Sequence, residues 1–62
     1  MFEVNEIVRI ADEPKGSINE YGMVTQIGDE WGRPGLYHVS NINMPFLGSI
    51  CKWMAAGRLE KE

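Results

Sequence analysis

Seven glycines and three prolines are spread along the 62 residues and divide the chain into short segments. No segment keeps apolar residues at helical spacing over the roughly eleven positions that an amphipathic helix requires. The segments are instead rich in β-branched and aromatic residues, and turn-forming residues bound them. A chain divided in this way is restricted to short strands joined by tight turns, so the sequence predicts an all-β domain.

The apolar segments predict about five strands. We expect them at residues 6–11, 21–27, 36–42, 49–53 and 58–61. Residues 54–57 hold the best helix formers, and Gly57 limits them to one short 3-10 turn before the last strand. Strand alternation predicts an inward-facing core made of Val8, Ile10, Val24, Ile27, Tyr37, Val39, Ile50 and Leu59. Val24 and Ile27 share a face only if a β-bulge separates them.

The short length favours a single domain over residues 1–62. A chain of this size buries only about 60% of the surface that its unfolded form exposes. A small, strongly bent barrel or two orthogonal sheets is the most economical way to bury the strands. Self-association would add buried area, so a homo-oligomer remains open. The starting Met1 and the lack of linkers lead us to expect a complete small protein.

Charge and hydropathy limit the classes of partner. The net charge is −3, and the basic residues do not form the dense stripe typical of duplex-binding proteins. No apolar run reaches the roughly 18 residues that a membrane span needs. The first residues lack the basic and apolar regions of a signal peptide. We therefore expect a cytoplasmic protein that does not enter a membrane.

The sequence predicts no catalytic residue, cofactor or metal. Cys51 is the only cysteine, which excludes an intramolecular disulfide and favours a reduced intracellular thiol. His38 is the only histidine, and the residues beside it supply no catalytic motif, so we interpret it as a structural or surface residue. Asp29 and Glu30 are too few to form a metal site, and we interpret them as solvated acids.

Several segments resemble the SH3-like barrel families. Residues 2–10 resemble the common opening of these families, with Asn5 at the usual glycine position of the turn. Residues 21–27 resemble the Gly-x-Val-x-x-Ile strand of KOW-type barrels, and residues 53–60 resemble a helical turn that leads into a closing strand. The resemblance covers nearly the whole chain and implies a five-stranded SH3-like small barrel.

Residues 35–40 and 48–49 are also similar to the family of plasmid-encoded, trimethoprim-insensitive dihydrofolate reductases. That family builds its active pore from a Val-Gln-Ile-Tyr strand, where this chain has Ile50, Cys51, Lys52 and Trp53. The resemblance therefore implies the fold without the residues that bind substrate and cofactor. An oligomeric reductase-type enzyme is the second alternative function.

The resemblance implies a binding function on the loops. The first two loops of an SH3-like barrel flank one groove, so Tyr21, Trp31, Asp12 and Glu13 are expected to line a common surface. This surface would suit a basic or proline-containing peptide of a protein partner, unless the acids only aid solubility. Trp31 lies in a glycine-rich loop, where it is either a lid on the core or an exposed anchor. The sequence therefore predicts a non-enzymatic protein-binding module from a bacterium or bacteriophage.

Two further features leave alternatives open. For the apolar run at residues 44–47, either Phe46 packs under the barrel or the run forms an oligomer or partner contact. A modest basic patch could also form around Trp53. Its four cations would be Arg33, Lys52, Arg58 and Lys61. A KOW-like module associated with nucleic acid is therefore the first alternative function.

Overall fold

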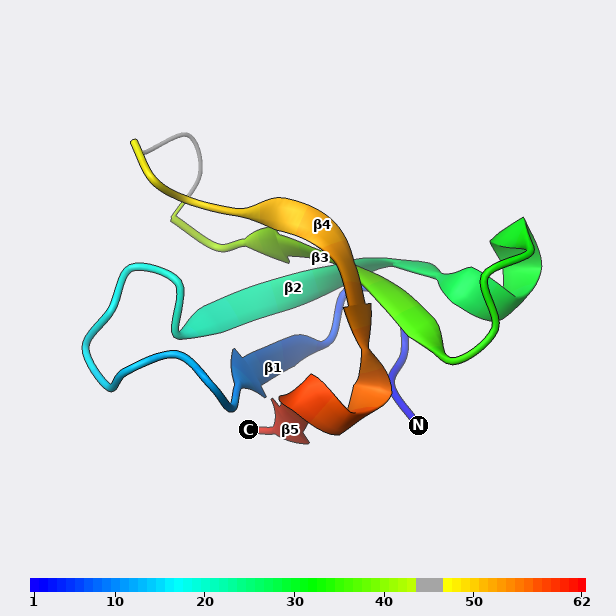
Figure 1. Ribbon diagram of the computed structural model, residues 1–62, viewed down its shortest axis with the longest axis horizontal. Helices are drawn as coiled ribbons and strands as arrows, with labels where there is room; N and C mark the ends of the chain where they lie inside the picture. The colour runs from blue at the N-terminus through cyan, green and yellow to red at the C-terminus, as the bar shows by residue number, and fades with distance from the viewer. Residues whose placement is uncertain (44–46) are drawn as a thin grey trace.

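The computed structural model describes residues 1–43 and 47–62. Their strands form one antiparallel five-stranded sheet in the order β4-β3-β2-β1-β5 (Figure 1). The strands are β1 Ile7–Ile10, β2 Tyr21–Ile27, β3 Leu36–Asn41, β4 Cys51–Ala55 and β5 Leu59–Lys61. Two 3-10 helices complete the described part of the chain, η1 Gly28–Trp31 and η2 Ala56–Arg58. The all-β prediction is confirmed. The described segments contain no helix with the length and hydropathy to span a membrane.

The 3-10 turn before the last strand is confirmed, but it starts later than predicted. β4 continues through Ala55, and Met54 pairs with Tyr37 in the β3–β4 ladder. Met54 is almost fully buried there, at 1% exposure, so tertiary packing outweighs the helix propensity of residues 54–57. The sequence did not predict η1, because its glycines indicated an irregular loop.

The predicted bulge in β2 lies at Thr25. Val24 pairs with Val39 and Gln26 pairs with His38, so one extra residue stands on β2. Without the extra residue, the side chains of Val24 and Ile27 would point to opposite faces of the sheet. With it, Ile27 packs against the core as expected. Asn5 adopts a positive φ of 75°, as its place in the opening turn predicted.

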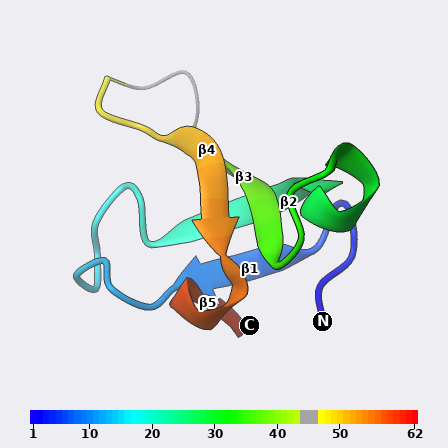
Figure 2. The same ribbon diagram turned by 45° about the vertical axis from the view of Figure 1, so that its right-hand side comes forward.

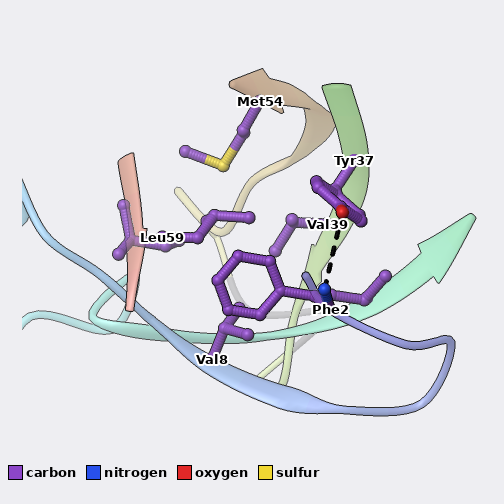
Figure 3. Close-up of a cluster of buried hydrophobic side chains, with 8 residues drawn as sticks. Phe2, Val8, Tyr37, Val39, Met54 and Leu59 are labelled. Carbon is purple, nitrogen blue, oxygen red and sulfur yellow. Dashed lines mark hydrogen bonds between the residues drawn. The ribbon is translucent and has the colours of Figure 1, made fainter. Parts of the chain in front are cut away.

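Among the described residues, eight buried hydrophobic side chains form the core on the inner face of the sheet (Figure 3). They are Phe2, Val8, Ile10, Val24, Tyr37, Val39, Met54 and Leu59. Six of these were predicted, while Ile27 and Ile50 are only partly buried against the cluster. Phe2 and Met54 were missed. The Phe2 ring meets Tyr37 edge-on at 5.4 Å, and the Phe2 N–H donates to the Tyr37 hydroxyl at 3.4 Å.

The sheet bends so that its two edge strands share this core. β4 pairs with β3 and β5 pairs with β1, and η2 joins β4 to β5 (Figures 1 and 2). Met54 from β4 and Leu59 from β5 nevertheless belong to the same buried cluster. The sheet is not closed by hydrogen bonds between β4 and β5, because these strands are the two ends of the strand order.

Candidate functional site

The residues predicted to share one surface lie at opposite ends of β2. Asp12 and Glu13 belong to the loop before β2, Tyr21 is its first residue, and Trp31 ends the 3-10 helix that follows it (Figure 1). A seven-residue strand is about 20 Å long, so β2 separates Trp31 from the other three. The expected common surface is therefore not formed. Phe46 lies outside the described residues.

Trp31 is exposed, which decides between the two interpretations of this residue. Its relative exposure is 60%, and it is not part of the buried core cluster. It ends η1, a turn whose residues 29–31 are all exposed, while Gly28 at its start is buried. Trp31 is therefore presented to solvent at the end of the molecule that contains η1.

The η1 turn is held by its backbone. The Gly28 carbonyl accepts hydrogen bonds from the N–H groups of Gly32 and Arg33, the latter at 2.8 Å. A Cβ on Gly28 would lie 2.1 Å from the Arg33 carbonyl oxygen and 2.4 Å from that of Leu36. Only glycine allows this close approach. Since these contacts are made by main-chain atoms, the turn keeps its shape without the Trp31 side chain.

Two carboxylates precede Trp31 on the same turn. Asp29 and Glu30 are both exposed, and Asp29 Oδ1 accepts a long hydrogen bond of 3.4 Å from the Gly35 N–H. The chain as a whole carries a net charge of −3. The exposed indole of Trp31 therefore directly follows two exposed carboxylates in the chain, and the exposed Arg33 lies two residues further on.

At the other end of β2, the predicted acids have partners within the chain. Asp12 forms an ion pair with Arg58 at 2.8 Å, and the hydrogen bond from Arg58 lowers the pKa of Asp12. Glu13 accepts a hydrogen bond of 3.2 Å from the Ser17 hydroxyl. Tyr21 is half-buried opposite Arg9. These residues contribute to the local structure of the loop, and partner binding by them stays a prediction.

An asparagine cluster fastens this loop to the segment before β4. Asn41 is 3% exposed, and its side-chain amide donates to the Ile18 carbonyl and to Asn19 Oδ1. Asn19 Oδ1 also accepts the Ile50 N–H at 3.1 Å, and the Asn19 amide donates to the Gly48 carbonyl at 2.9 Å. These side chains join loops that are distant in sequence. The sequence could have indicated this cluster through Asn41, because a polar residue at an inward position of a strand needs buried hydrogen-bond partners.

Exposed apolar residues accompany the asparagine cluster. Ile18, Ile42 and Leu47 are 41%, 50% and 99% exposed. Leu47 is the part of the predicted apolar run that the structure describes, and its exposure leaves the partner-contact interpretation open.

The predicted basic patch is divided among separate contacts. Arg58 pairs with Asp12, and Lys61 pairs with Glu6 at 3.1 Å. The Arg33 guanidinium stacks over the Trp53 ring at 5.2 Å from its centre. Two of the four predicted cations are therefore next to acids of the same chain, which reduces the positive potential available to a phosphate backbone.

The outward face of β2, β3 and β4 carries a second cluster that the sequence did not reveal. His38 on β3 meets the Trp53 ring edge-on at 5.2 Å. His38 also contacts Thr25 at the β2 bulge and Cys51 on β4. The residues that surround His38 come from neighbouring strands and not from its own, so no motif around position 38 could indicate them.

Within residues 1–43 and 47–62, no three His, Cys, Asp or Glu side chains are grouped so that they could hold a metal ion. No protein-family model, curated protein or solved structure matches this chain.

Proposed function

We propose that this protein is a cytoplasmic, non-enzymatic protein-binding module of a bacterium or bacteriophage, with Trp31 as its principal contact residue. The observation that carries the proposal is the 60% exposure of a tryptophan on a turn fixed by main-chain contacts. Burial of this indole inside the monomer would stabilise the fold, and the exposed position forgoes that gain. A protein partner that covers the ring would recover it.

The turn also reduces the cost of binding. Tryptophan offers a large contact area with only two side-chain torsions to fix, and such residues are frequent hot spots of interfaces. The backbone that carries Trp31 is already held by the hydrogen bonds to the Gly28 carbonyl. Little backbone entropy is then lost on association.

Asp29 and Glu30 support a partner segment that contains basic residues. Both acids are exposed next to Trp31. Exposed charges of this kind act on the rate of encounter and on the choice of partner more than on affinity. The matching ligand is a basic peptide segment with an apolar group for the indole.

The fold that we propose for this module is an SH3-like barrel. The strand order, the 3-10 helix between β4 and β5, and the shared core of the two edge strands support it. The left-handed turn at Asn5 supports it too, because the resemblance assigns a glycine to that position. These features concern the fold, and the binding function depends on Trp31.

Site-specific photo-crosslinking in the native host tests the function. A photoreactive phenylalanine analogue replaces Trp31, and the same analogue at Ile42, an exposed position, is the control. We expect a discrete crosslinked protein from position 31 that is absent from position 42. The partner is then purified and titrated, and Trp31→Ala is expected to weaken the Kd by about thirtyfold, equivalent to about 2 kcal/mol. An unchanged Kd would contradict the proposal.

Binding to nucleic acid is the competing function, and salt dependence separates the two. We expect no anisotropy change with mixed single-stranded and duplex oligonucleotides at low salt, since Arg58 and Lys61 already face acids. Binding that fades with added salt, and that is lost in Arg58→Glu with Lys61→Glu, would favour the KOW-like alternative.

A further inference from the structure

Thr25, His38 and Cys51 form a row across three strands on the outward face of the sheet. His38 pairs with Trp53 and Ser40 pairs with Cys51, so His38 and Cys51 are diagonal neighbours on adjacent strands. The Cys51 Sγ atom lies 3.8 Å from His38 Nε2, within hydrogen-bond reach for sulfur. Cys51 is exposed, so a reagent in solution can reach the sulfur.

The Thr25 hydroxyl contacts both the imidazole and the backbone of His38. The Thr25 hydroxyl oxygen lies 2.7 Å from His38 Nδ1 and 3.1 Å from the His38 carbonyl oxygen, and its one hydrogen can be donated to either atom. When the hydroxyl donates to the carbonyl oxygen, its own oxygen accepts a hydrogen bond from Nδ1–H. In that arrangement Nδ1 carries the ring hydrogen, and Nε2 presents a lone pair to Cys51.

Two contacts hold the ring in this orientation. Thr25 fixes the Nδ1 side, and the Trp53 ring packs edge-on against the imidazole at 5.2 Å and 76°. The bulge at β2 places Thr25 against His38, since Val24 and Gln26 occupy the regular pairing positions on either side. A nucleophile, a base and a group that orients the base are thus arranged in order.

We propose that Cys51 is a thiol-modification site that exchanges with low-molecular-weight disulfides, with His38 as its base. Nε2 accepts the proton of the Cys51 thiol, and the thiolate attacks one sulfur of the disulfide. A new S–S bond forms to Sγ as the S–S bond of the reagent breaks. The departing thiolate takes the proton from Nε2. The products are a mixed disulfide on Cys51 and one free thiol, so the disulfide reagent is the oxidant and the electrons balance.

Thr25 acts in this scheme as a positioning residue. It makes no contact with the sulfur in the reaction described, and its hydroxyl bonds Nδ1 so that Nε2 faces Cys51. Removal of the hydroxyl in Thr25→Val should slow exchange, and Thr25→Ser, which keeps the hydroxyl, should restore it. A role limited to packing would give the opposite order, because valine keeps the size of threonine.

The first test compares the native and unfolded wild-type protein. A neutral dipyridyl disulfide is added in excess, and the released thiopyridone is followed by absorbance. Denaturant separates Cys51 from His38, so we expect native protein to react at least about tenfold faster than unfolded protein, after correction with a small thiol in the same denaturant. The Cys51→Ser variant gives the background rate of thiopyridone release, because the chain has no other thiol. Equal or slower reaction of native protein would overturn the proposal without any need for a variant.

The second test uses His38→Gln, with folding checked by circular dichroism. We expect the variant to react about tenfold more slowly than wild type, at the lower end of the usual effect of a general base. Mass spectrometry of the product should show one reagent half per chain. A His38→Gln variant that folds and reacts at the wild-type rate would contradict the role of His38. The readout is independent of Trp31, so failure here leaves the proposed binding function unaffected.

Discussion

The two ends of β2 are held by different kinds of contact. At the Tyr21 end, side chains join the loops, with buried Asn41 and its neighbour Asn19 at the centre of a hydrogen-bonded cluster. At the Trp31 end, the main chain folds around buried Gly28, and the exposed side chains contribute little to the turn. Stability at the Tyr21 end depends on the identity of the side chains. Stability at the Trp31 end depends on the absence of a Cβ at Gly28, and the Trp31 side chain is available for another role.

The largest effect is expected at Gly28. In Gly28→Ala the new methyl group would overlap the carbonyl oxygens of Arg33 and Leu36. Backbone atoms cannot move aside easily, so we expect a loss of about 3 kcal/mol in the free energy of unfolding, measured by urea titration. Small domains have about 3–5 kcal/mol in total, so sucrose is added to all samples to keep the variant folded.

Gly57→Ala is the matched control for this prediction. A Cβ there would meet nothing within 4 Å. We expect its urea midpoint to stay near that of wild type. Comparable losses in both variants would mean that the packing around Gly28 does not hold the turn.

Asn41→Ala tests the opposite end. The substitution removes one of two hydrogen bonds to the Ile18 carbonyl, one of two to Asn19 Oδ1, and the acceptor of the Asn43 N–H. We expect the free energy of unfolding to fall by about 2 kcal/mol, because three hydrogen bonds of a part-buried cluster are lost together. Asn43→Ala removes one side-chain bond of 3.1 Å to the Ile18 carbonyl and should cost less than about 1 kcal/mol. Equal stability of Asn41→Ala and wild type would refute the contrast between the two ends.

A smaller effect concerns pH at the Tyr21 end. The Glu20 carboxylate accepts hydrogen bonds from the Gly16 N–H and from the Arg9 guanidinium. These bonds, the one from Gly16 first, lower the pKa of Glu20 below the ordinary 4.5. A carboxylate with a lowered folded-state pKa stabilises the fold above pH 4.5, and this stabilisation is lost as the pH falls below that value.

Amide hydrogen exchange locates that loss. We expect the protection factor of the Gly16 amide to fall as the pH drops below about 4.5, and Glu20→Gln to remove this dependence. The Gly32 amide, bonded to the Gly28 carbonyl at the other end, is the internal control. Parallel loss of protection at both amides would indicate global unfolding instead of a local change near Glu20.

Much of the fold was predictable because it follows from alternation along the strands. Val8, Val24 and Val39 stand at inward positions of apolar segments and are completely buried. The β2 bulge was predictable too, since Val24 and Ile27 cannot otherwise face the same side. Met54 was missed because local helix propensity competed with strand pairing, and only the packed core decides between them. Phe2 was missed because it precedes the first strand.

The candidate sites depend on arrangement in space, which the sequence reveals less well. Whether Trp31 folds back depends on the path of the η1 turn, and the glycines allowed several. The expected pairing of Trp31 with Tyr21 neglected that loops before and after one strand lie at its opposite ends. The contacts of His38 with Thr25 and Cys51 depend on the register of two strand pairs, and the bulge shifts one of them.

Equilibrium unfolding of Trp31→Ala tests the central claim most directly. The account predicts a free energy of unfolding within about 0.5 kcal/mol of wild type, because the 60% exposed ring contributes little to the fold. Trp53 remains as the fluorescent probe, and circular dichroism provides a second signal. An unchanged urea curve means that Trp31 is available to a partner at no cost to stability. A loss of about 2 kcal/mol or more would show that the ring is part of the packed structure, and would contradict the account.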